Sequence, residues 1–175
     1  MEQGIDHLVS LSPEKIPPHY AFPDLRHTLI PVEDFTGPTI AEIQKFLEIC
    51  DCARRDGEVR TDNILYKNNS KKLFQAVGVH CAEGRGRTGV MCACYLIYYY
   101  EMEPWDAIRI MRRQRPGSVE RKVQEETVVR FYQLLTDYGK ESIDSLHVRD
   151  KQLMEMQRKA QAELIRYSKT QYLPL

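Results

Sequence analysis

The feature that most constrains the fold of this chain is a ten-residue stretch, from His80 to Gly89, that reads His-Cys-Ala-Glu-Gly-Arg-Gly-Arg-Thr-Gly. A short apolar run (76–79) precedes it, and a long apolar and aromatic run (90–100) follows it. This context predicts a loop between a buried strand and the N-terminus of a buried helix. Unpaired N–H groups and the helix dipole favour an anion there, and glycines let the backbone turn its amides inward. The stretch therefore predicts a loop that wraps around a phosphate.

Three side chains of this stretch carry the expected chemistry. An anion-binding loop with a nearby arginine lowers the pKa of a thiol, so we expect Cys81 to be a thiolate nucleophile aimed at phosphorus. The planar guanidinium of Arg87 can hold two phosphate oxygens through an in-line displacement, and the Thr88 hydroxyl can assist the departing sulfur. The alternative is a buried structural cysteine beside a chance arginine. The residues expected to bind the phosphate are Ala82, Glu83, Gly84, Arg85, Gly86 and Arg87.

A carboxylate is needed as well, to protonate the leaving group and later to take a proton from water. The segment 32–38 is predicted to be a loop and carries two acids, Glu33 and Asp34. We expect Asp34 to be the general acid and base, because it is shorter and lies beside Phe35 and a Gly-Pro turn. The alternative is a pair of solvated loop carboxylates.

Length and hydrophobic pattern indicate one folded domain, residues 1–139, and a charged tail, 140–175. The tail has a weak apolar stripe, so it can be an exposed helix, a partner-binding helix or partly disordered. Strands are predicted at 7–11, 26–30 and 76–79, and helices are predicted to start near Thr39, Val90, Pro104 and Ser118. Gly57 is expected to stop the first helix, and Trp105 is expected to face the core.

Composition and cysteine count limit the partners and the compartment. The 25 basic and 25 acidic residues cancel, which gives no bulk attraction to nucleic acid or membranes. No stretch has the composition of a signal peptide or a membrane span, so we expect a cytoplasmic protein that also enters the nucleus, and a monomer. The five cysteines are expected to be free thiols, with Cys50, Cys92 and Cys94 in packing roles. One of those three is alternatively a partner for an oxidised Cys81.

Two charged groups leave alternatives open. The arginines of the segment 112–115 either end a helix in solvent, which we favour, or form a rim for acidic substrates. Within the loop, Arg85 could attract multiply phosphorylated substrates, whereas Glu83 would oppose it. A simple Glu83–Arg85 ion pair is the slightly favoured interpretation.

The stretch from Val79 to Gly89 resembles the signature of the protein tyrosine phosphatase superfamily, His-Cys-x5-Arg-Thr/Ser-Gly. Further short matches resemble the small atypical dual-specificity phosphatases, over roughly residues 4–138. They are Gly57-Glu58, Ala76-Val77-Gly78-Val79, Ala93-Cys94-Tyr95-Leu96, Asp106-Ala107-Ile108, Arg115-Pro116-Gly117-Ser118 and Gln124-Glu125.

The resemblance implies an α/β fold: a single phosphatase domain with a mostly parallel central sheet flanked by helices. It implies phosphorylated protein substrates, bearing phosphotyrosine and also phosphoserine or phosphothreonine, and no metal or organic cofactor. By the same resemblance Cys81 is the nucleophile, Arg87 the phosphate binder, Asp34 the acid and base, and Thr88 the helper of the thiolate. His80 is a supporting residue, and Gln124 matches a glutamine that positions the hydrolytic water in relatives.

Two departures from the family pattern affect the expected framework. Relatives usually begin with a further strand and helix, so we expect an unprotected sheet edge here. The 17 residues Val59–Gln75 separate two matching segments, and we hypothesise a retained intron that sequencing of the transcript would test. The alternative functions are a phosphoinositide or RNA 5′-phosphatase, and a phosphate-binding scaffold without activity.

Overall fold

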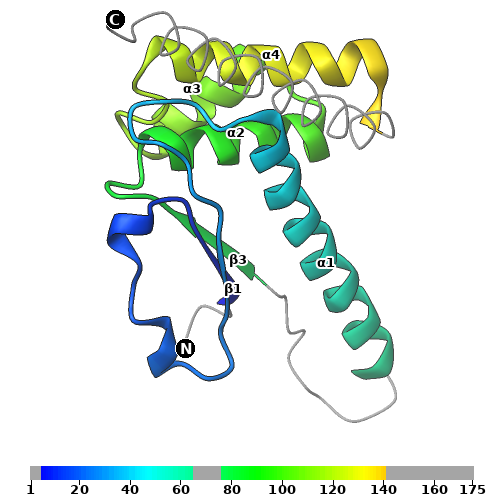
Figure 1. Ribbon diagram of the computed structural model, residues 1–175. Coiled ribbons are helices and arrows are strands. Elements are labelled where there is room, and N and C mark those ends of the chain that lie inside the picture. The colour runs from blue at the N-terminus through cyan, green and yellow to red at the C-terminus, as the bar shows by residue number, and fades with distance from the viewer. Residues whose placement is uncertain (1–4, 65–75, 141–175) are drawn as a thin grey trace, which may run out of the picture. The chain divides into compact units, whose positions relative to one another are not determined.

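The computed structural model describes residues 5–64 and 76–140 (Figure 1). The chain divides into two compact units, Met1–Asp137 and Tyr138–Leu175, and the first contains the sheet and the loops discussed below. The expected division at residues 139 and 140 stays a prediction, and nearly all of the tail lies outside the described residues.

Three strands form the central sheet. They are β1 (Ile5–Ser10), β2 (Arg26–Leu29) and β3 (Ala76–His80). All pairings among these strands are parallel, in the order β2-β1-β3. The register places Ser10 opposite both Leu29 and His80, so the three strands end at nearly the same level. The predicted strands are confirmed, as is the α/β class.

Four α-helices accompany the sheet. They are α1 (Ile40–Ile64), α2 (Gly86–Tyr100), α3 (Pro104–Gln114) and α4 (Lys122–Tyr138). Helices α1 and α2 both contact β3, and α3 packs against α2. Much of α2 is buried, as its apolar sequence predicts. Helix α2, which begins within the cysteine-containing loop, therefore holds that loop against the core.

Local signals account for several helix ends. Thr39 donates its N–H to a carboxylate oxygen of Glu42 (2.6 Å) and accepts the Glu42 N–H at its hydroxyl (3.3 Å), which confirms a capping box before α1. At the other end of the domain, Gly139 has φ +74° directly after α4. Glycine adopts this left-handed conformation without strain, so Gly139 stops the helix as predicted.

Three expectations about the helices are wrong. Helix α1 runs through Gly57 to Ile64, because one glycine in a helix interior costs only about 1 kcal/mol. The predicted insertion thus begins as helix, and residues 65–75 lie outside the described ranges. Trp105 is 53% exposed, whereas Ile108 of the same helix is buried. Ser118 caps no helix, because it lies four residues before the start of α4 and its hydroxyl donates to the Arg115 carbonyl.

None of the helices in the described ranges is long and apolar enough to cross a membrane.

Candidate active site

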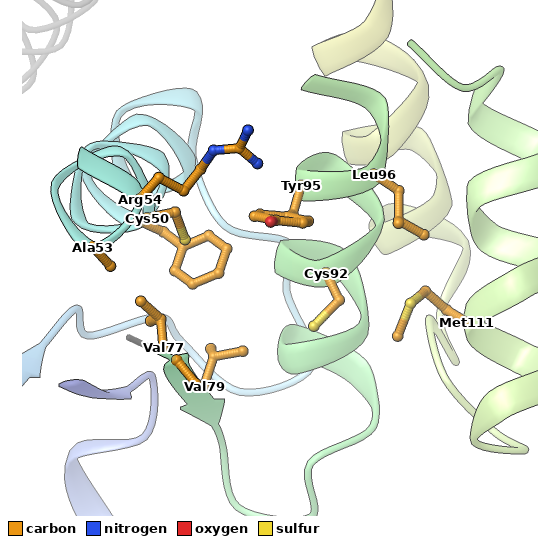
Figure 2. Close-up of a pocket in the computed structure, with 11 residues that line it drawn as sticks. Cys50, Ala53, Arg54, Val77, Val79, Cys92, Tyr95, Leu96 and Met111 are labelled. Atoms are coloured by element: carbon orange, nitrogen blue, oxygen red, sulfur yellow. The ribbon is translucent and has the colours of Figure 1, made fainter. Parts of the chain in front are cut away.

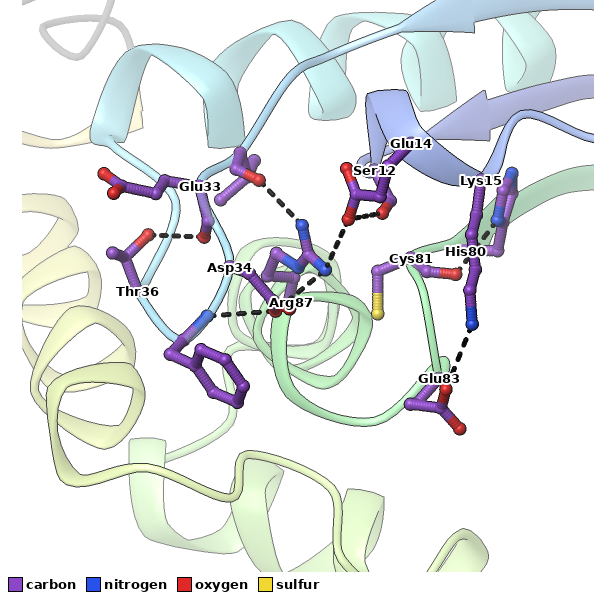
Figure 3. Close-up of polar contacts among 12 residues, drawn as sticks. Ser12, Glu14, Lys15, Glu33, Asp34, Thr36, His80, Cys81, Glu83 and Arg87 are labelled. Atoms are coloured by element: carbon purple, nitrogen blue, oxygen red, sulfur yellow. Dashed lines mark hydrogen bonds and ion pairs between the residues drawn. The ribbon is translucent and has the colours of Figure 1, made fainter.

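The site is assembled where the three parallel strands end. Strand β1 leads into a short 3-10 helix, η1 (Pro13–Lys15), which carries Glu14. Strand β2 leads into the loop 32–38, which carries Asp34, and β3 leads directly to Cys81. Loops that follow the carboxyl ends of parallel strands meet at one edge of a sheet, where ligands of α/β proteins bind. Residues far apart in the sequence therefore converge on the Cys81 sulfur (Figure 3).

The loop after β3 directs backbone N–H groups at the sulfur. Gly84 has φ +67° and donates its N–H to Cys81 Sγ at 3.2 Å. Burial by itself raises the pKa of the Cys81 thiol, but hydrogen bonds from the Thr88 hydroxyl and from the N–H groups of Thr88, Gly84 and Glu83 outweigh it. The pKa therefore lies below its ordinary value. This agrees with the expected thiolate, since donors favour the charged form.

Thr88 is well placed for the expected helper role. Its hydroxyl oxygen is buried, and its interaction with the Cys81 sulfur lowers the pKa of that thiol. A hydroxyl in this position can donate to the sulfur anion and so favours the charged form.

Arg87 is buried at the centre of the site, with 2% of its side chain exposed. One terminal nitrogen donates to the Val32 carbonyl at 2.8 Å. The other lies 2.8 Å from Asp34 Oδ1 and 3.5 Å from Glu14 Oε1 (Figure 3). The guanidinium is thus oriented by the loop 32–38, called the acid loop below because it carries Asp34, and its charge is neutralised by two carboxylates. A phosphate entering the loop would compete with these carboxylates for the same donors.

The loop 32–38 presents Asp34 to the site and Glu33 to solvent. Asp34 Oδ1 accepts the Phe35 N–H at 3.0 Å in addition to the ion pair with Arg87. The Glu33 carboxylate makes no hydrogen bond or ion pair with the part of the chain that is described, and Figure 3 shows it directed away from Arg87. Phe35 has φ 60°, a conformation that costs energy in residues other than glycine and is frequent at functional sites.

Gln124 links the two loops from the first turn of α4. Its side chain is buried and donates from Nε2 to the Thr36 carbonyl at 3.0 Å. A side chain at Gly86 would come within 2.6 Å of this nitrogen, so Gln124 lies directly against the phosphate-binding loop. The residue is near enough to serve the site, and its role in positioning water stays a prediction.

The charged side chains around the phosphate-binding loop that follows Cys81, called the cysteine loop below, form other ion pairs than expected. Glu83 forms an ion pair with Lys15 of η1 (3.2 Å), and Arg85 makes no ion pair with any described residue. The favoured Glu83–Arg85 pair is therefore wrong. The loop is attached to η1 instead, and the exposed Arg85 side chain remains available beside the site.

The arginines at the C-terminal end of α3 are exposed, and two of them also donate to nearby backbone carbonyls. Arg115 donates to the Glu83 carbonyl at 2.7 Å, and Arg112 donates to the carbonyls of Ser118 and Val119 (3.2 and 2.8 Å). Arg112 also pairs with Glu125 at 2.6 Å. These contacts fasten the cysteine loop and the turn after α3 to each other. The exposed side chains agree with the favoured solvated helix end, and the rim for acidic substrates stays a prediction.

His80 lies behind the loop, where Figure 3 shows it against the Cys81 carbonyl oxygen. Its ring nitrogen Nδ1 is 3.2 Å from that oxygen, and its Nε2 is 2.6 Å from the hydroxyl of Ser10. Two other residues at the site were missed from the sequence, Ser10 and Glu14. Each is an isolated polar residue that belongs to no recognisable sequence motif, so only the fold shows that it lies at the site.

Three other cysteines are less acidic than Cys81. Burial raises the pKa of Cys50 to about 12 and that of Cys92 to about 11, and it raises the pKa of Cys94 further. Cys50 and Cys92 line a pocket of about 390 Å³ between α1, β3, α2 and α3, and Cys81 is not among the pocket's residues (Figure 2). All five cysteines are free thiols. The alternative of a resolving partner for Cys81 stays untested.

Solved structures share the fold. The chain superposes on human DUSP28 with a TM-score of 0.61 at 18% identity, over 78% of this chain and 82% of that one. It superposes on Tk-PTP in its active form with a TM-score of 0.60 at 23% identity, over 74% and 80% of the two chains. At these identities the likeness establishes the architecture alone.

Sequence relatives identify the family. The chain is 34% identical over 86 residues to dual specificity protein phosphatase CDC14C of Homo sapiens, a match that covers 49% of this chain and 15% of that protein. It is 30% identical over 118 residues to tyrosine-protein phosphatase cdcA of Emericella nidulans, over 67% and 17% of the two. This chain thus spans less than a fifth of either relative. The family model "Swiss Army Knife protein, DSP-PTPase phosphatase domain" matches residues 1–128, so the chain belongs to the DSP-PTPase phosphatase family.

Proposed function

We propose that the protein is a cysteine-dependent phosphatase that hydrolyses phosphate monoesters of proteins through a cysteinyl-phosphate intermediate. The observation that carries the proposal is the Cys81 sulfur, whose thiol pKa is lowered and which lies in a loop with Arg87 buried beside it. Such a loop binds a dianionic phosphate and presents a thiolate to the phosphorus atom.

In the first step the Cys81 sulfur attacks phosphorus, and the bond between phosphorus and the substrate oxygen breaks. Protonated Asp34 gives its proton to the leaving oxygen, as general acid catalysis requires. Arg87, released from Asp34 and Glu14 by the incoming phosphate, holds the equatorial oxygens as charge spreads over them.

In the second step a water molecule attacks the phosphorus of the intermediate. The Asp34 carboxylate takes a proton from this water, the sulfur–phosphorus bond breaks, and inorganic phosphate leaves. The Thr88 hydroxyl stabilises the thiolate that forms again. Gln124, which bridges the acid loop and the cysteine loop, is the proposed residue that orients the water.

Within the family, the proposed substrates are phosphotyrosine proteins first and phosphoserine or phosphothreonine proteins second. The matched motifs favour the small atypical group that includes dual-specificity protein phosphatase 23. A monomer in the cytoplasm and nucleus remains our proposal for its state and location.

A second candidate substrate is a phosphoinositide, and one observation favours it. Arg85 is exposed on the phosphate-binding loop without an ion pair to a described residue, and Lys15 already neutralises Glu83. An additional cation beside the site favours substrates with several phosphates. A solved structure with the same fold, at 20% identity and a TM-score of 0.60, is PTPMT1 in complex with PI(5)P.

A substrate panel tests the proposal. Phosphate release is measured with a phosphotyrosine peptide, a phosphothreonine peptide, a soluble inositol phosphate and a 5′-triphosphorylated RNA. We expect the phosphotyrosine peptide to have the highest kcat/KM. Faster turnover of the inositol phosphate, reduced selectively in Arg85→Ala, would instead support the second candidate. Binding of the peptides without turnover would support a scaffold.

The acid loop supplies a prediction of its own. Asp34→Ala should lower kcat on an alkyl or phenyl phosphate by about 10²-fold or more, because the leaving oxygen then departs unprotonated. The descending limb of the pH–rate profile, where the acid loses its proton, should also disappear. Glu33→Ala is the matched control, since its carboxylate is solvent-directed, and it should leave both features in place. A larger loss in Glu33→Ala would assign the acid to that residue instead.

A further inference from the structure

A buried serine connects two histidines behind the cysteine loop. The Ser10 side chain is 0% exposed, at the last position of β1. Its hydroxyl oxygen lies 2.6 Å from His80 Nε2 and 2.8 Å from His27 Nε2. The parallel register of β1 and β3, which pairs Ser10 with His80, creates the first contact. The second crosses to β2, so all three strands contribute to one hydrogen-bond chain.

The chemistry of the last acceptor fixes the direction of this chain. The Cys81 carbonyl oxygen can only accept a hydrogen bond, so His80 Nδ1, which lies 3.2 Å from it, must carry the hydrogen. In the neutral imidazole Nε2 is then an acceptor, and the Ser10 hydroxyl must donate to it. Because the single hydroxyl hydrogen of Ser10 is used there, His27 must donate its Nε2–H to the Ser10 oxygen. The chain therefore runs from His27 through Ser10 and His80 to the Cys81 carbonyl.

We propose that Ser10, supported by His27, is a positioning residue for the phosphatase reaction, because it holds His80 in the tautomer that donates to the Cys81 carbonyl. That donation fixes the first peptide group of the loop. It thereby keeps the following N–H groups directed at the sulfur. This inference rests on the proposed function for its catalytic meaning, although the orientation of the loop can be tested without turnover.

Polar and titratable groups surround this chain of hydrogen bonds on several sides. The His19 ring, from the 3-10 helix η2 (His19–Ala21), stacks on His27 at 3.9 Å between ring centroids. Burial lowers the pKa of His27, and the neighbouring His19 and His80 rings disfavour a further positive charge there. His27 donates from Nε2 whether its other nitrogen is protonated or not. The direction of the chain is therefore kept when His27 gains a proton.

Charged and titratable groups of each neighbouring segment also face the Cys81 end of this chain of hydrogen bonds. They are Glu14 and Lys15 of η1, Asp34 of the acid loop, Glu83 and Arg87 of the cysteine loop, and Arg115 after α3. All of these remain in the variants described next, so a difference between variants reports on the Ser10 hydroxyl.

The test compares two hydroxyl deletions in the same sheet, each at a hydroxyl that contacts a histidine of a neighbouring strand. Ser10→Ala removes the link to His80. Thr28→Val removes a hydroxyl that also contacts a histidine, since Thr28 Oγ1 lies 2.9 Å from His7 Nε2, but has no connection to His80. The Cys81 thiolate is titrated by its ultraviolet absorbance, with the matching Cys81→Ser protein subtracted in each background. Denaturant unfolding of each variant is recorded in parallel.

In Ser10→Ala the Cys81 pKa is expected to rise by roughly half a pH unit to one pH unit, which corresponds to the net value of one hydrogen bond. In Thr28→Val the titration should match the unsubstituted protein. The ascending limb of kcat/KM should move to higher pH in Ser10→Ala by the same amount. An unchanged Cys81 titration in Ser10→Ala, or an equal change in both variants, overturns the proposal.

A spectroscopic measurement on the unsubstituted protein provides an independent test. The nitrogen chemical shifts of His80 report which ring nitrogen carries the proton. We expect the proton on Nδ1, and a proton on Nε2 alone would overturn the proposal even if Ser10→Ala fails to fold. If the protein hydrolyses no phosphate ester but the Cys81 titration moves as expected, the positioning role stands and the proposed function fails. Normal turnover with an unchanged titration would leave the proposed function in place and overturn the positioning role.

Discussion

Replacing Cys81 by serine is expected to reduce phosphate release from para-nitrophenyl phosphate by about 10⁴-fold or more, the order of loss when a covalent nucleophile is removed. The loop around Cys81 is built to stabilise a sulfur anion. It lowers the pKa of the thiol through the Gly84 N–H and the Thr88 groups. A serine hydroxyl in the same place has a far higher pKa than a thiol, so the loop cannot make it an alkoxide near neutral pH.

The control for this prediction is Cys52→Ser. Cys52 is an exposed cysteine on α1 whose sulfur accepts a hydrogen bond from Arg55, one turn further along the helix, so its replacement should leave turnover unchanged. Phosphate or vanadate binding by Cys81→Ser, followed by isothermal calorimetry, would show that the loop is still folded. Undiminished turnover by a folded Cys81→Ser protein contradicts the account.

Replacing Arg87 by lysine is expected to lower kcat/KM by about 10³-fold, although the positive charge is kept. The planar fork of arginine can hold two phosphate oxygens at once, and lysine is a single flexible point charge. The structure adds a second reason. Arg87 is nearly fully buried, and one of its nitrogens donates to the Val32 carbonyl. A lysine would leave this carbonyl without its donor and would loosen the acid loop.

Arg85→Lys is the comparison for this variant, because Arg85 is exposed two residues earlier in the same loop. With a small substrate such as para-nitrophenyl phosphate, we expect a much smaller loss of kcat/KM than in Arg87→Lys. Equal losses in the two variants would show that the loop needs only positive charge, which would contradict the role of the Arg87 geometry.

The local parts of the fold were predictable because they depend on short-range patterns. The strand, loop and helix around Cys81 follow from an apolar run, two glycines and a second apolar run. The capping box at Thr39 follows from residue types three positions apart. In contrast, the end of α1 was misplaced, because the helix propensity of a single glycine is too weak a signal to fix where a helix stops.

Site residues could be predicted where the side-chain type alone indicates a chemical role. They could not be predicted where the role depends on a contact between residues far apart in the sequence. Cys81, Arg87 and Asp34 could be selected for a nucleophile, a phosphate-binding group and an acid, and the structure brings these three together (Figure 3). Glu14 could not be selected: it reaches Arg87 across 73 positions of sequence through the arrangement of strands β1 and β3.

Arg115 is a second residue whose tertiary contact could not be predicted from its local sequence. Its position near a helix C-terminus predicts a cation in solvent, because helix dipoles favour positive charge there. The side chain is exposed, as predicted, and its guanidinium also donates to the Glu83 carbonyl of the cysteine loop, 32 positions earlier. Local sequence explains why a basic residue is tolerated at this position, and only the tertiary structure shows which group it binds.

The covalent intermediate is the most direct test of the central claim. Asp34→Ala protein is mixed with para-nitrophenyl phosphate, whose leaving group departs without a general acid, and the reaction is quenched in acid after one turnover. Without Asp34 the attacking water has no base, so the intermediate should accumulate. We predict one phosphoryl group on the peptide that contains Cys81, detected by mass spectrometry. Steady turnover of para-nitrophenyl phosphate with phosphate on another residue, or with no modified peptide in the quenched protein, would contradict the account.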